Sequence, residues 1–265
     1  MYRFVTHSIW GIIALVCLCL GGCDFSNPVS PQTPLVLPPE LSVEEHALKD
    51  RPEVEPLTFV PVKSTQAEIL SKHQGERDKH PDWPYPNHAS LGNDKLTAIT
   101  DETNTNNGSK VSVQVSRNGA AIYTIQLGDS SPFGSLRGLW AYDNHWVLEV
   151  VHAAAKKIFP NTMDYDVFGE VIQDGISLNK QHGYQETFGF QLMRGKPFYF
   201  FKKQGRLGVS YDHREIPLGY TQILHYGCCS ASALNPRSAE NMVAFFARRG
   251  TVRPVWHYVE IGVFE

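Results

Sequence analysis

Alternating strands around tight turns are the feature that most constrains the fold. Val111, Val113 and Val115 alternate with polar residues, and Asn118-Gly119 then leads into a second alternating run over 121–125. Side chains of a strand point alternately to its two faces, and Asn-Gly accepts the positive φ of a two-residue hairpin turn. The pattern therefore predicts an antiparallel hairpin.

Similar turn residues recur along the second half of the chain. They are Tyr142-Asp143-Asn144, Asp174-Gly175, Lys202-Lys203-Gln204-Gly205, Tyr211-Asp212-His213 and Arg248-Arg249-Gly250. The repetition predicts a mainly β fold of antiparallel hairpin and meander repeats, small or incomplete propeller-like in form, with a β-sandwich as the alternative. A closed propeller needs at least about four blades, and residues 110–265 hold three or four units at most.

Two stretches carry conflicting local signals. Residues 235–250 begin with Asn-Pro and end in Arg-Arg-Gly, which suits a helix, but they also match the hairpin around Gly205. The alternation over 256–263 would supply a return strand, so we expect a hairpin there. Residues 147–151 indicate a strand, and the alanines and lysines of 153–157 indicate a helical turn after it.

The N-terminus has the pattern of an export signal. Arg3 precedes an apolar run over 9–20 that is shorter than the roughly 18 residues a membrane-spanning helix needs. Leu20-Gly21-Gly22-Cys23 then resembles the lipobox of bacterial lipoproteins. This resemblance implies that residues 1–22 are a signal peptide and that Cys23 is acylated. It also implies that the protein is anchored in the bacterial cell envelope on the extracytoplasmic side.

Proline content divides the remaining chain. Eleven of the 17 prolines precede residue 87. Residues 23–62 are therefore expected to form a lipidated, extended tether. Residues 63–109 are expected to be a mixed segment, with a short helix over 65–72 where Thr65 and Glu68 have capping-box spacing. Residues 110–265 are expected to form the β-repeat domain.

Charge and cysteine content exclude some classes of protein. The formal net charge is −3 and no basic run occurs, which argues against nucleic acid as a partner. We expect a membrane contact through the lipidated N-terminus and an envelope ligand or protein as the other partner. Two of the five cysteines lie in the signal and Cys23 is acylated, so only Cys228 and Cys229 remain as thiols. The chain is therefore not a disulfide scaffold.

One serine resembles a known nucleophile. Leu127-Gly128-Asp129-Ser130 is similar to the Gly-Asp-Ser block of GDSL-type lipases and esterases, in which the serine attacks the substrate. That family also needs an Asp three residues before a His, and this chain has no such pair. The family is doubly wound, whereas hairpins are expected here. A plain turn at Ser130 is the preferred interpretation.

His225, Cys228 and Cys229 form the second candidate site. Two thiolates and an imidazole could hold zinc or copper with a fourth ligand such as His213 or His182, although adjacent cysteines seldom bind one ion. A vicinal disulfide would be strained and therefore redox-active, because neighbouring Cα atoms are only about 3.8 Å apart. A structural role, as buried thiols or as a disulfide that shapes a turn, is the preferred interpretation.

Aromatic residues crowd the second half, where they could form a binding platform or, more commonly, a core. The lysines and arginines of the turns at 202–203 and 248–249 are expected to be solvated. The segments 138–143, 195–201, 225–229 and 241–246 resemble a group of bacterial lipoproteins and secreted proteins with no assigned activity. That resemblance implies export and adds no chemistry.

No phosphate loop, dinucleotide fingerprint, zinc-binding His-Glu-x-x-His helix or nucleophile elbow is present in the sequence, and no cofactor is expected. The sequence therefore favours a lipid-anchored envelope protein whose β domain binds a ligand or partner without catalysis. The alternative is an envelope hydrolase or a redox or metal-binding enzyme that uses Ser130, or His225 with Cys228 and Cys229.

Overall fold

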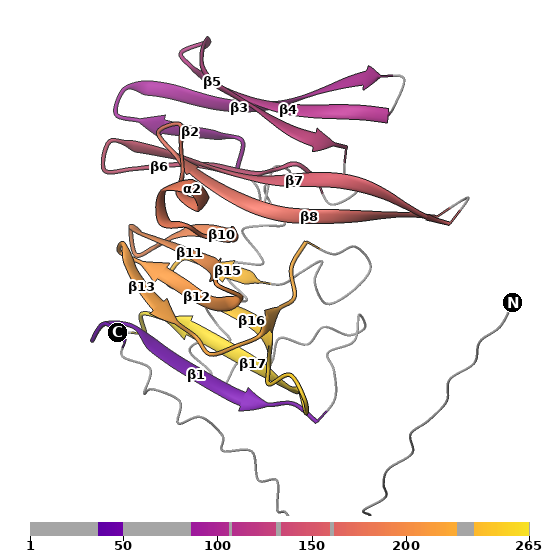
Figure 1. The fold of residues 1–265 in the computed structure, drawn as a ribbon. Coiled ribbons are helices and arrows are strands. Elements are labelled where there is room, and N and C mark those ends of the chain that lie inside the picture. Colours follow the sequence, from indigo (N-terminus) through magenta and orange to yellow (C-terminus); the bar gives the residue numbers. More distant parts are fainter. Residues whose placement is uncertain are drawn as a thin grey trace, which may run out of the picture. The chain divides into compact units, whose positions relative to one another are not determined.

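The described part of the chain is mainly β, as predicted. The computed structural model describes residues 37–49, 86–105, 108–130, 134–159, 162–226 and 236–264, with backbone alone for 157–159 and 162–163. All of these residues belong to one compact unit, Pro34–Glu265. Their strands form three sheets in which nearly all neighbours are antiparallel (Figure 1). No helix among the described residues is both long and apolar enough to cross a membrane.

The largest sheet has eight strands in the order β2-β3-β4-β5-β7-β8-β9, with β6 paired to β7. Its strands are β2 (His88–Leu91), β3 (Asp94–Thr105), β4 (Gly108–Arg117), β5 (Ala120–Asp129), β6 (Leu136–Tyr142), β7 (His145–Phe159), β8 (Thr162–Gln173) and β9 (Ile176–Ser177). β5 and β7 meet in parallel at Gly128 and Ala153 alone. A Cβ on Gly128 would lie 2.5 Å from the Ala153 carbonyl oxygen, so this approach requires glycine.

The other two sheets are smaller. The four-stranded sheet has the order β10-β11-β12-β13. Its strands are β10 (Glu186–Met193), β11 (Lys196–Lys203), β12 (Arg206–Tyr211) and β13 (Arg214–Pro217). The five-stranded sheet has the order β1-β17-β16-β14, with β15 on β16. Its strands are β1 (Ser42–Ala47), β14 (Gln222–Ile223), β15 (Arg237–Ala239), β16 (Met242–Arg249) and β17 (Val255–Gly262).

The first half of β7 and the end of β8 are buried on both faces, which explains the nearly continuous apolar run at the start of β7. On one face, Leu148 and Val150 share a core with the valines of β4. On the other face, Val147 packs with side chains of β10 and β11, and Val151 joins the largest core. The two strands therefore form a middle layer between the β3–β5 hairpins and the four-stranded sheet.

The largest core joins the four-stranded and five-stranded sheets. Phe200 of β11 has its ring centroid 5.1 Å from that of Phe188 and 5.0 Å from that of Phe245 on β16. Val243 and Val259 of the five-stranded sheet belong to the same buried cluster. This face-to-face packing of sheets fits the sandwich alternative.

The predicted hairpin turns are confirmed. Asn118 and Gly119 join β4 to β5 with φ of 53° and 85°, and Asp174 and Gly175 join β8 to β9 with φ of 51° and 82°. In residues 236–250 of the ambiguous stretch, β15 pairs with β16, and β16 pairs with β17 along its whole length. These described residues contain no helix, so the expected hairpin is confirmed there.

Other expectations differ from the structure. The helical turn predicted over 153–157 was wrong: β7 continues through it because Ala154 pairs with Asp166 and Lys156 with Asp164 on β8. The sheets also include strands before residue 110, since β1 pairs with β17 and β3 with β4. The signal peptide, Cys23, the 65–72 helix, Cys228 and Cys229 lie outside the described residues.

A short helix that was not expected from the sequence, α2 (Leu178–His182), follows β9 as a single turn. Ser177 caps its start by accepting a hydrogen bond from the Lys180 N–H at 3.2 Å. Gly183 ends it in the left-handed conformation, with φ of 68°. α2 contacts both β8 and β10, so it lies where the eight-stranded and four-stranded sheets meet.

Candidate functional site

A pocket of about 300 Å³ lies where several hairpin turns and α2 come together. The β6–β7 turn, the β8–β9 turn and the β12–β13 turn each contribute to its wall, and β10 and β11 contribute to its floor. The lining residues are Tyr142, His145, Gln173, Asp174, Ile176, Leu178, Gln181, His182, Phe190, Pro197, Tyr199 and His213. They are spread over some 70 positions of the sequence, so only the fold brings them together.

Aromatic rings form much of the pocket floor. Phe190 and Tyr199 are buried, and the Phe190 ring centroid lies 6.4 Å from that of Tyr142. Burial raises the pKa of Tyr142 to about 12, so its phenol stays protonated at neutral pH. The Tyr142 hydroxyl donates a hydrogen bond to Gln173 Oε1 at 3.0 Å. The floor is therefore apolar, with a fixed polar edge.

Three imidazoles stand around the pocket. His145 Nδ1 lies 2.5 Å from Asp174 Oδ2, and Asp174 Oδ1 accepts from the Trp146 N–H at 3.0 Å. The His182 ring stacks on Tyr184 with a centroid separation of 5.2 Å. His213 is exposed in its turn, with φ of 64°. The pocket rim therefore carries three imidazoles, one beside the β6–β7 turn, one in α2 and one in the β12–β13 turn.

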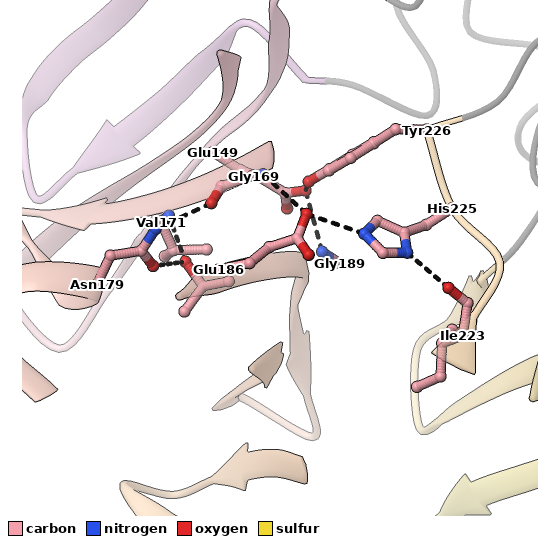
Figure 2. A network of polar contacts seen from close by, with 10 residues as sticks. Glu149, Gly169, Val171, Asn179, Glu186, Gly189, Ile223, His225 and Tyr226 are labelled. Carbon is pink, nitrogen blue, oxygen red and sulfur yellow. Dashed lines mark hydrogen bonds and ion pairs between the residues drawn. The ribbon is translucent and has the colours of Figure 1, made fainter. Parts of the chain in front are cut away.

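A polar network that includes the pocket residue Phe190 is centred on Glu149, which is 3% exposed (Figure 2). Its Oε1 accepts hydrogen bonds from the Gly189 N–H at 3.0 Å and the Tyr226 hydroxyl at 2.8 Å. Its Oε2 accepts from the Phe190 N–H at 2.7 Å. A bulge in β10 between Phe188 and Gln191 allows the two backbone N–H groups to face Glu149. Glu149 thus links β7, β10 and the segment after β14, and it fixes Phe190 in the pocket floor.

The bulge requires glycine at its first position. Gly189 has φ of 66°, and a Cβ there would lie 3.0 Å from Phe200 Cδ2 and 3.2 Å from Pro236 Cγ. Gly195 has a similar φ of 76°, but a Cβ there would meet nothing within 4 Å. The two positions share the backbone conformation and differ in crowding.

We therefore expect Gly189→Ala to destabilise the protein more than Gly195→Ala. Gly195→Ala is expected to lower the free energy of unfolding by about 1–2 kcal/mol through backbone strain alone. Gly189→Ala adds an overpacking cost of about 1–3 kcal/mol. Urea denaturation of both variants measures the difference, and equal losses would show that the crowding at Gly189 has no effect.

A second part of the network pairs Glu186 with His225 (Figure 2). His225 Nε2 lies 3.0 Å from Glu186 Oε1, and His225 Nδ1 lies 2.8 Å from the Ile223 carbonyl oxygen. Both partners are hydrogen-bond acceptors, so each ring nitrogen of His225 faces an acceptor within the protein. The ring also stacks on Phe188 at a centroid separation of 3.7 Å. Both nitrogens of His225 are therefore occupied by partners within the protein.

Glu186 makes this pair sensitive to acid. Burial alone would raise the pKa of Glu186, but the hydrogen bond and charge of His225 and the Gly169 N–H outweigh it and lower the pKa. A lowered folded-state pKa contributes stability that is present above the ordinary value of 4.5 and is lost as pH falls through the folded value. The pKa values of Glu45 and Glu170 are also lowered, so they add to the same trend.

We expect the urea midpoint to fall as pH drops below 4.5, and Glu186→Gln to weaken that dependence. The variant should be less stable than the wild type at pH 7, and the difference in free energy of unfolding between the two should become smaller as the pH falls. Glu102→Gln, at an exposed position of β3, is the matched control. A stability difference that stays constant from pH 7 to pH 3 would contradict the role of Glu186 in the acid sensitivity.

A third group of hydrogen bonds attaches α2 to the sheets. The Thr187 hydroxyl donates to Asn179 Oδ1 at 2.7 Å and accepts from the Val171 N–H at 2.7 Å. Asn179 Nδ2 donates to the Gly169 carbonyl oxygen at 3.0 Å. Asn179 lies in α2, which carries Gln181 and His182 at the pocket. The buried network therefore holds both the floor and one wall of the pocket.

Ser130 lies away from these features, at the end of β5. Its N–H donates to the Ser109 carbonyl oxygen at 2.9 Å. The preceding Asp129 binds Lys110 Nζ at 2.5 Å and the Ala155 N–H at 2.8 Å. Among the described contacts of this turn, none involves an imidazole. Within the described residues, the structure therefore places no base beside Ser130.

The other predicted site residues are dispersed. His182 and His213 lie at the pocket, whereas His225 belongs to the buried network. Within the described residues, no group of three or more His, Cys, Asp or Glu side chains could hold a metal ion. Two of the basic turn residues are paired: Lys203 with Glu215 and Arg249 with Glu45, both at 3.0 Å.

Sequence reasoning missed the buried Glu149, the partly buried Glu186 and the pocket. Glu149 interrupts an otherwise apolar run, and a lone acid between valines is a signal for a buried, paired carboxylate. The pocket residues had no such signal, because each one is ordinary in its own turn. The sequence matches no protein-family model, and no curated protein matches it. The geometry of the pocket and its supporting network therefore carries the functional argument.

Proposed function

We propose that this chain is a bacterial lipoprotein that is anchored in the cell envelope through Cys23. Its β domain binds a small ligand, without catalysing a reaction, in the pocket formed by the hairpin turns and α2, which we call the turn pocket. The observation that carries the proposal is the pocket itself, which combines an aromatic floor with a polar rim. Ligand sites are concave, mostly apolar and equipped with a few placed polar groups. The Leu20-Gly21-Gly22-Cys23 pattern supports the anchor.

Rigidity of the pocket supports a binding role. Phe190 is held through its own N–H by Glu149, and α2 is held by the Asn179–Thr187 pair. The His145–Asp174 pair ties the β6–β7 turn to the β8–β9 turn. A pre-organised site loses little conformational entropy when a ligand binds, and this favours affinity.

The enzyme alternative has less support. Nucleophilic catalysis needs a base within hydrogen-bond reach of the nucleophile. The described contacts around Ser130 include no imidazole, and both nitrogens of His225 already face acceptors. A non-catalytic binding domain is therefore the better proposal.

Ligand-induced thermal stabilisation tests the binding role. We expect at least one compound of a panel of neutral, anionic and cationic small molecules to raise the Tm of the full-length protein in detergent micelles. A ligand at 100 times its Kd adds about 2.7 kcal/mol of stability. Asn tolerates the left-handed conformation of residue 213, so His213→Asn should fold normally and reduce the shift.

His88→Asn is the matched control, because His88 is exposed on β2 and does not line the pocket. It should leave the ligand-induced shift unchanged. A shift that both variants retain in full would place binding elsewhere. The absence of a shift across the whole panel would count against a small-molecule site.

A further inference from the structure

The chemistry of the pocket lining identifies a class of ligand, starting from its size. A volume of about 300 Å³ is at the lower end of the range of about 300–1,000 Å³ for small-molecule sites. It corresponds to roughly ten water molecules at about 30 Å³ each. The pocket therefore suits one small ring, and a larger ligand would have to extend into solvent.

The charged groups of the pocket lining argue against an ionic ligand. Asp174 is the single carboxylate in the lining, and its Oδ2 already faces His145 at 2.5 Å. None of the described lining residues is Lys or Arg, so no permanent positive charge is available for a phosphate or carboxylate. Burying a charged group without a partner is costly. The lining therefore favours an uncharged ligand.

The arrangement of polar and apolar groups narrows the class further. The apolar part of the lining consists of the half-buried Tyr142 and of Phe190 and Tyr199, which are each 4% exposed. The polar part consists of the amide groups of Gln173 and Gln181 and the imidazole of His182. Gln173 Oε1 accepts from the Tyr142 hydroxyl, but the Gln173 amide nitrogen donates no hydrogen bond within the described residues. A ligand therefore needs an apolar face for the rings and hydrogen-bonding groups along its edge.

We infer that the turn pocket binds a neutral sugar residue, with its C–H face on the aromatic floor and its hydroxyl groups hydrogen-bonded to Gln173 and the rim imidazoles. This inference rests on the proposed binding function and names its ligand. Each sugar hydroxyl both donates and accepts, so it can pair with the amide and imidazole groups around the rim. An aromatic amino-acid side chain would cover the same rings but would leave those polar groups unpaired.

Calorimetric titration of the full-length protein in detergent micelles tests the inference. The probes are neutral disaccharides of glucose, galactose, mannose and N-acetylglucosamine, a hexuronate disaccharide, and a short Phe-containing peptide. We expect at least one neutral disaccharide to bind, and the hexuronate and the peptide to bind more weakly. Gln173→Ala should weaken binding about 3- to 10-fold, because one hydrogen bond is lost.

Gln126→Ala is the matched control, since Gln126 is an exposed glutamine of β5 outside the pocket lining. It should bind the sugar as the wild type does. His213→Asn provides a second pocket variant if Gln173→Ala does not fold. Sugar binding that neither pocket variant weakens would overturn the inference.

The probes also separate this inference from the binding function on which it rests. Preferential binding of the Phe-containing peptide or the hexuronate, weakened by Gln173→Ala, would overturn the sugar assignment and leave the pocket as a binding site. No binding of any probe would overturn the sugar assignment. If the wider thermal-shift panel also gave no shift, the proposed function would fail as well.

Discussion

Replacing Glu149 with alanine is expected to lower the free energy of unfolding by about 3–5 kcal/mol. The substitution would remove the acceptor of the Gly189 and Phe190 N–H groups and of the Tyr226 hydroxyl. Each buried donor without a partner costs about 1–3 kcal/mol. Domains are commonly stable by about 5–15 kcal/mol, so the loss would be a large fraction of the total.

Urea denaturation of Glu149→Ala measures this loss, with Glu102→Ala on exposed β3 as the control. The control should change stability by less than about 0.5 kcal/mol. Tyr226→Phe removes a single donor and should lower the free energy of unfolding by about 1 kcal/mol. This milder variant can be measured even if Glu149→Ala does not fold. A loss below about 1 kcal/mol for Glu149→Ala would contradict the role of Glu149 in joining three segments.

The second large effect concerns the membrane anchor. Cys23→Ser is expected to abolish acylation and to release the protein from the membrane fraction. Each buried methylene of an acyl chain contributes about 0.8 kcal/mol, and stable anchoring needs more than one chain. Serine has no thiol for the thioether-linked lipid of bacterial lipoproteins, so the change removes the whole attachment.

Metabolic labelling with an alkyne fatty acid, followed by membrane fractionation, measures both effects in a bacterial host. The wild type should be labelled and pelleted with membranes, whereas Cys23→Ser should carry no label. Cys17→Ser and Cys19→Ser, within the apolar run, should behave as the wild type does. Full labelling of Cys23→Ser would contradict the assignment of Cys23 as the lipidated residue.

Local rules predicted the hairpins because the relevant information is local. Asn118-Gly119 and Asp174-Gly175 adopt the positive φ that two-residue turns need, and the alternating residues on each side set the strand faces. The 235–250 stretch was resolved correctly because its return strand was visible at 256–263. Fold class and most turns therefore followed from residues within about ten positions of one another.

The helical turn predicted at 153–157 failed because partners distant in sequence override local propensity. Alanine and lysine favour a helix in isolation, but β8 offers this stretch a complete antiparallel partner. Lys156 also forms an ion pair with Asp166 across the two strands. The strength of such a pairing depends on the partner strand and cannot be read from one segment.

The pocket could not be predicted for a related reason. Tyr142, Gln173 and His213 each belong to a turn with an ordinary sequence, and their convergence depends on how the sheets pack. Glu149 gave a weak signal as an acid among apolar residues, whereas Glu186 stands between Gln185 and Thr187 and gave none. Their partners, the N–H groups of the β10 bulge and His225, are about 40 positions away in the sequence. Packing between layers, rather than local pattern, determines the site.

Histidine-ring NMR signals give the most direct test of the turn pocket as the ligand site. The protein is titrated with whichever compound raises its Tm or binds in the calorimeter. His145, His182 and His213 line the pocket, so their ring signals should shift together and saturate. The signals of His46 and His88, on β1 and β2, should stay unchanged. Saturable shifts at His46 or His88 with none at the three pocket histidines would contradict the proposed binding site.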